Sequence, residues 1–518
     1  MPSHSKRILP RAGAFLLAAG LCFGLLGLGG CNKDDGAGKV INYPIAQAPQ
    51  RLDPAIARGP AELLVLGNCM EGLLRQDADG KLVPGVAQRW ETSGDGRVLT
   101  FYLREDNQWR LPDKAAELLG EEALAAFDTR VTAEDFVFGL ERARGFAEEY
   151  ANIKGVRAVD GRTLEITLEQ PGRAILYALA RGAAMPCRRA YFEACKGRYG
   201  LEPRYLPCNG PFYLERMDDV LTRLKPNAGY RENEEERALP GTVNLWTEPD
   251  EYIRARMVGI EYDAAVAPPG VEPQLQEGVT GQELRNATLA LVFNCGAAPL
   301  DDTNIRVALC AALEPGTLGG AMPGLLPDGE RAGGENYRAQ VGPPEGIGHD
   351  LARAGTLAEA AQEKILLHLI CAPAHETLLR RALQAWQKVF RLGLEAQIEP
   401  LEPEELEERL EAGDFDVAVA ELRMEHSSAL EALQALEGEG SLARYRSPAL
   451  ERLLREAAQS DDAARACLQA EEHLLQNGVF YPLEARTSRL LLADGVEGLE
   501  VSPAGEQVGF MRVRKREK

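Results

Sequence analysis

The chain has 518 residues, of which 45% are hydrophobic and 26% charged, and its formal net charge is −21. A chain of this length exceeds one ordinary hydrophobic core and predicts two or three compact units of the soluble, globular kind. The acidic balance argues against a nucleic-acid partner, which would need basic patches, and leaves cationic ligands open.

The first 30 residues differ from the rest of the chain. Lys6, Arg7 and Arg11 precede an uncharged run over 12–30. A basic start followed by such a run is typical of a secretory signal peptide, although a run of 19 residues is also long enough to span a bilayer. The end of the run, Leu28-Gly29-Gly30-Cys31, resembles a bacterial lipobox.

This resemblance implies cleavage after the signal peptide 1–30 and lipid modification of Cys31, with a polar tether over 31–39. Two or three acyl chains hold a protein on a membrane where a single chain is marginal. We therefore expect an exported lipoprotein anchored to the bacterial cell membrane, facing the periplasm or the cell exterior.

The first predicted elements follow the tether. Residues 40–45 form a strand candidate, and apolar residues at helical intervals predict an amphipathic helix over 61–74. Asp77-Ala78-Asp79-Gly80 has the residues of a tight turn. The strict alternation over 98–103 predicts a half-buried strand.

The next segment, 110–130, is predicted to be a surface helix with a loop, built on 115–127. Thr132 followed three residues later by Asp135 forms a capping-box pattern and predicts the start of a helix. Alternating apolar residues around a central Asp-Gly pair predict a hairpin over 156–168.

In the second half, 289–294 reads as a buried strand, and the Gly- and Pro-rich segment 316–348 as a long surface loop. Strands at 364–371 and 394–398 around a helix over 376–392 predict a βαβ unit. The alternation then continues with a helix over 401–411, a strand over 414–419, and amphipathic helices over 447–458 and 461–475.

The stretch from 52 to 91 carries a series of short motifs: Leu52-Asp53-Pro54, Asn68, Glu71-Gly72-Leu73-Leu74, Asp77 to Leu82, Pro84-Gly85, Ala87 and Trp90. This series resembles the opening signature of family 5 extracellular solute-binding proteins, the oligopeptide, dipeptide and nickel receptors of ABC importers. The resemblance continues, in family order, at 100–104, 131–136 and 207–214. It covers most of 40–500 and is weakest at the ligand positions.

The resemblance implies an α/β protein with the two-lobed periplasmic-binding-protein type II fold (cluster C) and an extra small domain in the first lobe. It places the first lobe at 40–70, 186–285 and 490–518, the small domain at 71–185, and the second lobe at 286–489. In such proteins the ligand binds between the lobes and stabilises the closed form, and the small domain usually acts as a scaffold.

The ligand positions implied by the resemblance follow the strand predicted at 416–420. In peptide-binding relatives an aspartate at this place pairs with the α-amino group of the peptide. The register puts Glu425 on that aspartate, His426 on a tyrosine and Leu422 on a tryptophan of the family pattern. A carboxylate is therefore kept as an ammonium anchor, while the aromatic residues are lost. The alternative is that Glu425 is a solvent-facing loop residue.

Two further segments are implied as ligand contacts. Arg58, Gly59 and Pro60 fall where relatives pair a strand edge with the peptide backbone, although Pro60 has no N–H to donate. Val266 and Ala267 fall on the facing contact segment.

No motif for catalysis is found. The sequence has no G-x-S-x-G, H-E-x-x-H, P-loop or G-x-G-x-x-G pattern, and no two histidines are four residues apart. We therefore expect no enzyme, no catalytic residue, no cofactor and no metal.

The function that these patterns favour is a monomeric, membrane-anchored solute-binding protein that captures an oligopeptide and delivers it to the permease subunits of an ABC importer. Three alternatives remain open. A divergent family member would bind a nickel chelate or a sugar, a sensor would bind without transport, and a surface-anchored enzyme would belong to another class.

The chain has ten cysteines, which is many for this class. Two of them are expected at the signal peptide and the lipid site, which leaves Cys69, Cys187, Cys195, Cys208, Cys295, Cys310, Cys371 and Cys467. An oxidising location permits disulfides, but the many pairings that eight cysteines allow leave the connectivity undetermined. Buried free thiols are the alternative.

Overall fold

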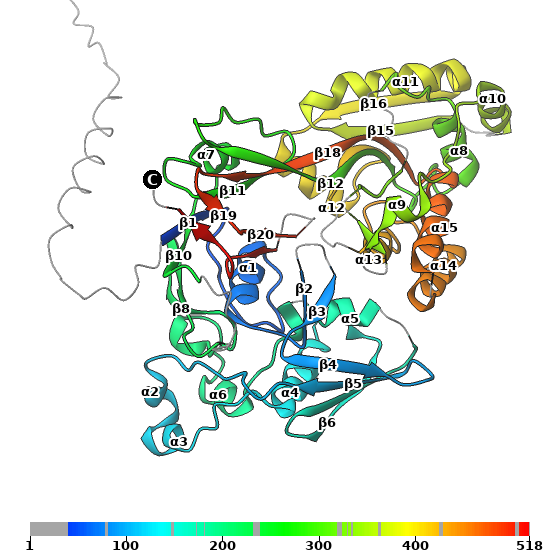
Figure 1. Ribbon diagram of the computed structural model, residues 1–518. Helices are drawn as coiled ribbons and strands as arrows, with labels where there is room; N and C mark the ends of the chain where they lie inside the picture. The colour runs from blue at the N-terminus through cyan, green and yellow to red at the C-terminus, as the bar shows by residue number, and fades with distance from the viewer. Residues whose placement is uncertain are drawn as a thin grey trace, which may run out of the picture. The chain divides into compact units, whose positions relative to one another are not determined.

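The computed structural model describes most of the chain after residue 39 (Figure 1). The described residues all belong to one compact unit, 39–518. The predicted signal peptide, the tether and Cys31 lie outside the described residues. The described ranges are 40–77, 81–146, 150–171, 174–180, 182–230, 239–318, 324–328, 330–332, 335–360, 364–423, 428–460, 462–502 and 507–516.

A four-stranded sheet brings the start of the described chain beside residues far along the sequence. β1 (Val40–Ile45) lies at one edge and runs parallel to β10 (Thr242–Thr247). β9 (Leu221–Pro226) and β8 (Phe212–Met217) complete the sheet in antiparallel pairing. The predicted strand over 40–45 is confirmed.

Helix α1 (Pro60–Cys69) is shorter than the predicted helix over 61–74. Asn209 accepts a hydrogen bond from the Glu71 N–H at 3.1 Å and donates one to the Glu71 carbonyl at 2.9 Å. Because these backbone groups are satisfied by a distant side chain, the chain leaves the helix without another turn. The predicted buried face is confirmed, since Leu64, Val65 and Cys69 are 6%, 0% and 0% exposed.

A second four-stranded sheet has the order β4-β5-β7-β6. Its strands are β4 (Ala87–Thr92), β5 (Val98–Leu103), β7 (Thr163–Leu168) and β6 (Ile153–Asp160). Helix α4 (Ala133–Ala143) begins where predicted, and the Asp135 carboxylate accepts the Thr132 N–H at 2.9 Å. The predicted strand, hairpin and capping box are confirmed.

The segment 110–130 contains two short helices in place of the one predicted over 115–127. They are α2 (Ala115–Leu119) and α3 (Glu121–Ala125). Gly120 separates them with φ 81° and ψ 155°, a backbone conformation that only glycine adopts readily. The helical pattern therefore predicted the helical residues but not the break.

A six-stranded sheet has the order β11-β18-β12-β17-β15-β16 (Figure 1). Its centre is the long antiparallel pair β12 (Thr280–Phe293) and β18 (Phe480–Leu492). One end of this pair is extended by β11 (Ala264–Ala267), and β12 pairs on its other side with β17 (Val417–Arg423). The strand predicted at 289–294 is thus the last part of a much longer one.

The predicted βαβ unit is confirmed in the same sheet. β15 (Ile365–Cys371) and β16 (Leu394–Pro400) are parallel neighbours, and α11 (Glu376–Phe390) connects them. Trp386 of this helix is fully buried in the core that the helix forms with the sheet. The local pattern was sufficient here because strand, helix and strand follow one another directly.

The prediction of a surface loop over 316–348 is wrong in part. The segment contains β13 (Arg331–Ala332), β14 (Glu335–Asn336) and α9 (Tyr337–Val341). Tyr337 is fully buried, and its hydroxyl donates to the buried Glu471 carboxylate at 2.9 Å. Glu471 also accepts the N–H groups of Leu325 and Leu326 at 2.7 and 3.0 Å.

The remaining elements are short or surround the three larger sheets. The helices are α5 (Ala174–Ala178), α6 (Arg189–Ala194), α7 (Glu251–Arg256), α8 (Thr303–Ala311), α10 (Leu351–Ala360), α12 (Pro403–Ala412), α13 (Ala429–Gln434), α14 (Pro448–Gln459) and α15 (Ala463–Gln476). The remaining strands are β2 (Leu74–Gln76), β3 (Leu82–Pro84), β19 (Val496–Glu497), β20 (Glu500–Val501), β21 (Val508–Gly509) and β22 (Arg514–Lys515). Within the described ranges, no helix has the length and apolar character needed to cross a membrane.

Candidate functional site

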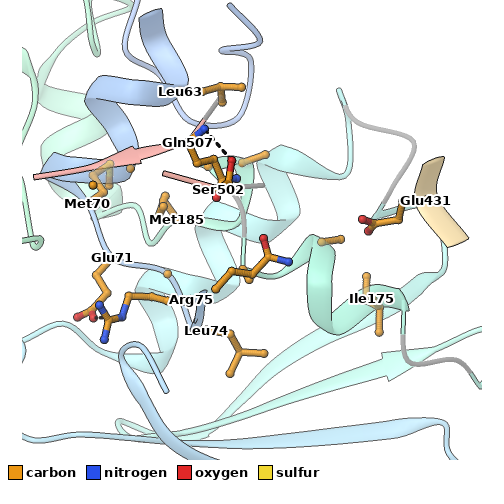
Figure 2. Close-up of a pocket in the computed structure, with 18 of the residues that line it drawn as sticks. Leu63, Met70, Glu71, Leu74, Arg75, Ile175, Met185, Glu431, Ser502 and Gln507 are labelled. Atoms are coloured by element: carbon orange, nitrogen blue, oxygen red, sulfur yellow. Dashed lines mark hydrogen bonds and ion pairs between the residues drawn. The ribbon is translucent and has the colours of Figure 1, made fainter. Parts of the chain in front are cut away.

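A cavity of about 1120 Å³ is the candidate site (Figure 2). One part of its wall comes from α1 and the chain that follows it, and another from residues between 151 and 185. Residues of α13 and α14 line it as well, together with the β20–β21 hairpin. Segments from the first half and from the last part of the described chain therefore meet at one cavity.

The wall combines apolar and polar side chains. Leu63, Met70, Ile175 and Met185 supply apolar surface, and Figure 2 shows Glu431 on a separate part of the wall. Methionine side chains adapt their shape to what they contact, because they are unbranched and flexible. Such a wall suits a ligand with an apolar body and a few polar groups.

Glu71 lies at the cavity wall, but its carboxylate is already occupied by protein partners. Its side chain is 2% exposed and accepts hydrogen bonds from Arg104 at 2.7 Å and from the Tyr230 hydroxyl at 2.8 Å. Asn107 donates to the same carboxylate at 3.3 Å. Glu71 therefore fixes the cavity wall and is not an available anchor for a ligand.

Two of the arginines at the cavity are also engaged. The Arg58 guanidinium donates to the carbonyls of Ala57 and Ala55 at 2.7 and 3.2 Å. Arg75 lies 3.3 Å from the Glu71 carboxylate. Arg455 of α14, by contrast, lines the cavity and makes no ion pair within the described ranges. It is a cationic group that a ligand can reach.

Behind the α13 wall lies a second buried carboxylate, Glu330. Its side chain is 3% exposed, and its Oε2 atom has no hydrogen-bond partner among the described residues. Burial, together with the negative charge of Glu431, raises the pKa of Glu330 well above its usual range. Removal from water favours the neutral carboxyl because the charged form loses its hydration.

The structure brings part of the predicted contact set to the cavity. Arg58 and Pro60 line it, and Gly59 lies between them as the N-cap of α1. Val266 and Ala267 belong to β11, where they pair with β18, and neither is among the described residues at the cavity wall.

The predicted anchor segment is only partly described. Glu425 and His426 lie outside the described residues. Leu422 is 4% exposed and packs into a hydrophobic core next to β12, so its side chain does not line the described cavity. The cavity residue Glu431 belongs to α13, the helix that follows the segment along the chain.

Several cavity residues were missed by the sequence analysis. The wall formed by α13, α14 and the β20–β21 hairpin carries no motif, since its residues are separated by loops and each helix shows only an ordinary amphipathic pattern. Residues of the predicted small domain, which was expected to be a scaffold, also line the cavity, including Ile175 and Met185. No sequence signal marks either of these walls.

The described histidines form no catalytic or metal arrangement. His473 accepts or donates hydrogen bonds with the hydroxyls of Tyr445 and Ser447 at 3.1 and 3.2 Å, and Ser447 caps α14. His473 has no carboxylate partner among the described residues that would complete a triad. His368 does pair with a carboxylate, since its Nε2 lies 2.7 Å from Glu399. Across the described ranges, no three His, Cys, Asp or Glu side chains converge on a point where a metal ion would bind.

Comparisons with known proteins place these observations in a family. Residues 81–441 match the model of the bacterial extracellular solute-binding proteins, family 5 Middle. The periplasmic murein peptide-binding protein MppA of Escherichia coli is 24% identical over 90% of this chain and 91% of its own length. The dipeptide-binding protein DppE of Bacillus subtilis is 25% identical over 94% of this chain and 96% of its own.

Solved structures show the same fold. The Escherichia coli murein tripeptide binding protein MppA has a TM-score of 0.68 at 22% identity, over 93% of this chain and 99% of that one. Listeria monocytogenes OppA bound to peptide has a TM-score of 0.67 at 19% identity, with the same coverage. The predicted α/β, periplasmic-binding-protein type II fold is confirmed, and the chain belongs to the family 5 bacterial extracellular solute-binding proteins.

Proposed function

We propose that the protein is a membrane-anchored solute-binding protein that captures a peptide in the cavity and delivers it to an ABC import permease. The cavity itself carries this proposal. Its volume of about 1120 Å³ exceeds the roughly 300–1000 Å³ of ordinary small-molecule pockets, so it accommodates a ligand of several residues. The relatives MppA and DppE are named for binding murein peptide and dipeptide, which supports a peptide as the ligand.

Glu425 is proposed as the anchor of the peptide α-ammonium. A charged ammonium in a closed, water-poor site needs a counter-charge, because an unpaired charge there is prohibitively costly. The carboxylate of Glu71 is occupied by Arg104 and Tyr230 and does not meet this need. The resemblance of this segment to the family pattern supports position 425 for the role.

Calorimetry with a peptide that co-purifies with the protein tests this assignment. Glu425→Gln is expected to lower the affinity by two to three orders of magnitude, which corresponds to the roughly 3–5 kcal/mol lost when one partner of a buried pair is removed. N-acetylation of the peptide removes the ammonium and should weaken binding to the wild type similarly. Glu439→Gln is the matched control, because Glu439 is exposed and does not line the cavity.

An affinity of Glu425→Gln within about threefold of the wild-type value would remove Glu425 from the site. Mass spectrometry of the co-purified ligand decides between a peptide and the other solutes. A nickel chelate or a sugar in place of a peptide would retain the binding function and change the ligand class.

The lipid anchor is proposed at Cys31. The basic start, the uncharged run and the sequence Leu28-Gly29-Gly30-Cys31 support it. Cys31→Ser should leave the protein without acyl chains and release it from the membrane fraction. Detection of lipid on the Cys31→Ser protein would contradict the assignment.

We further propose that the protein binds without turnover. The named relatives are binding proteins, and His473 lacks the carboxylate partner that a triad requires among the described residues. Purified protein, free of proteases, should return its co-purified ligand unchanged after prolonged incubation. Steady hydrolysis of peptides or esters would overturn this part of the proposal.

A further inference from the structure

Two buried cysteines from distant parts of the chain lie side by side beneath the cavity wall. Cys69 is the last residue of α1, and Cys208 lies in the turn before β8. Their side chains are within hydrogen-bonding reach of each other, and their exposed fractions are 0% and 1%. All eight described cysteines carry free thiols in the structure.

The backbone holds both residues in place. The Gly210 N–H donates to the Cys69 carbonyl at 2.9 Å, and a Cβ added at Gly210 would lie 2.7 Å from the Cys69 carbonyl carbon. Cys208 exchanges two backbone hydrogen bonds with Arg110, at 3.1 and 2.6 Å. The chain that carries Cys208 is thus anchored against the end of α1 at Gly210, two residues further along, which keeps the two thiols next to each other.

We propose that Cys69 and Cys208 form a disulfide in the exported protein. The proposal rests on the export that the proposed function requires, but not on the identity of the ligand. Disulfides persist in the periplasm and on cell surfaces, where the cytosolic reducing systems are absent. The oxidant is an external disulfide, either that of a thiol oxidoreductase or a small disulfide such as oxidised glutathione.

The exchange balances in two steps. The thiolate of one cysteine attacks the external disulfide, forms a mixed disulfide and releases one external thiol. The second cysteine, as its thiolate, then attacks the cysteine sulfur of the mixed disulfide and releases the second external thiol. The external disulfide gains two electrons and the two protons that the cysteines lose.

The burial of the Cys69 thiol indicates when the disulfide forms. Burial is the largest cause that raises the pKa of Cys69 well above its usual range, and the neighbouring Cys208 raises it further. A thiol that is both buried and held neutral reacts slowly, because the thiolate is the nucleophile. Oxidation is therefore expected during folding, before α1 packs against the turn that carries Cys208.

The bond would stabilise one wall of the cavity. Cys69 is followed directly by Met70 and Glu71, which line the cavity. Cys208 is followed by Asn209, whose side chain makes two hydrogen bonds with the Glu71 backbone. A disulfide at this point would link the two segments whose hydrogen bonds already end α1 and position Glu71.

Differential alkylation of the wild-type protein tests the proposal without any variant. The full chain is exported by its own signal sequence and purified without reductant, then denatured and treated with a first alkylating reagent. After reduction, a second reagent of different mass is added. The peptides that contain Cys69 and Cys208 should carry only the second label, and without reduction they should be recovered as one linked species.

Two results would overturn the proposal: both peptides carrying the first label, or either cysteine linked to another partner. Cys195 is the informative competitor, since its Sγ lies 3.9 Å from the Tyr205 carbonyl and the Cys208 Sγ lies 3.6 Å from the carbonyl of the next residue, Leu206. Exported protein with both thiols free that still binds its ligand would overturn the disulfide and leave the proposed function intact. Loss of ligand binding with the disulfide present would overturn the proposed function and leave the disulfide proposal intact.

The effect of reductant on the Tm tests the disulfide independently. A disulfide that closes a loop of about 139 residues restricts the unfolded chain strongly, so reductant should lower the wild-type Tm by about 5 °C. Cys69→Ala and Cys208→Ala should each show no response to reductant. Cys467→Ala is the matched control, because Cys467 is equally buried and should leave the reductant response unchanged. A wild-type Tm that does not change with reductant would contradict the proposal.

Discussion

The buried carboxylate of Glu71 shows how one residue holds several segments together. It bonds Arg104, Asn107 and Tyr230, while its backbone N–H and carbonyl bond Asn209. A charge in this position is tolerated because its partners replace the water that it loses on folding. Removing one partner therefore costs more than the contact itself is worth.

Arg104→Met is predicted to lower the free energy of unfolding by about 3 kcal/mol. The substitution leaves Glu71 buried without its nearest cation, which lies at 2.7 Å. Arg157→Met is the matched control, because Arg157, which lies 2.8 Å from Glu165, is 64% exposed and its ion pair should contribute less than about 1 kcal/mol. Urea unfolding of both variants measures the difference, and equal losses would show that burial of Glu71 does not govern the cost.

Glu330 gives a prediction for pH dependence. The pKa of this acid is raised in the folded protein by burial and by Glu431. Its contribution to stability is therefore fully present below the unfolded pKa of about 4.5 and is lost as the pH rises through the folded pKa. Glu330→Gln keeps the neutral form at every pH.

The variant should thus gain stability over the wild type as the pH increases from about 4 to 8, since only the wild type loses this contribution. The measurement is the difference in unfolding free energy between the two proteins at each pH. Glu437→Gln serves as a control, because burial of the Glu437 carboxyl is much less complete than that of Glu330. A difference that stays constant over this range would show that Glu330 is ionised in the folded protein.

At the residue scale, local roles could be predicted from sequence and distant ones could not. The Thr132–Asp135 capping box was predicted because both partners lie within one turn of helix. Asn209 entered the sequence analysis only as part of the motif at 207–214, whereas its side chain bonds Glu71, 138 residues away. Nothing in the chain near Asn209 indicates that contact.

The same distinction applies to the elements. The unit β15–α11–β16 follows from local periodicity, since its three elements are consecutive. Segment 316–348 was interpreted as a surface loop because its composition is rich in glycine and proline. Part of this segment is buried where the Leu325 N–H and the Tyr337 hydroxyl bond Glu471 of α15, more than 130 residues further along the chain. Composition therefore predicted irregular structure correctly but not its burial.

Gly120 is predicted to determine the break between α2 and α3. Gly120→Ala should lower the free energy of unfolding by about 1–3 kcal/mol, since an alanine at φ 81° and ψ 155° is strained. No atom of the described residues lies within 4 Å of the added Cβ, so any loss reports the backbone conformation alone. Gly155→Ala is the control: its Cβ also meets open space, its φ is not in the left-handed region, and it should be neutral. Equal Tm values for the two variants would contradict the prediction.

For the whole molecule, the long pair β12–β18 is the feature that the sequence showed least. Only 289–294 was predicted, because the start of β12 is exposed and polar and does not read as a buried strand. Its partner strand, β18, lies about 200 residues further along the chain. This pair links β11 at one end of the sheet with β17, the strand that precedes the predicted anchor.

The cavity is lined by residues before 231, by α13 and α14, and by the β20–β21 hairpin, so a peptide that fills it contacts all of these walls. A ligand that binds only the folded chain at 100 times its Kd stabilises that chain by about 2.7 kcal/mol. If its contacts on the different walls form together only in a closed arrangement, the ligand also shifts the population toward that arrangement.

We therefore predict that a bound peptide both raises the Tm and lowers the radius of gyration measured by small-angle X-ray scattering. The N-acetylated peptide and the Glu425→Gln protein are the controls and should show much smaller changes at the same concentration. A higher Tm with an unchanged scattering curve would show that the peptide contacts one wall alone and that the protein does not close around it.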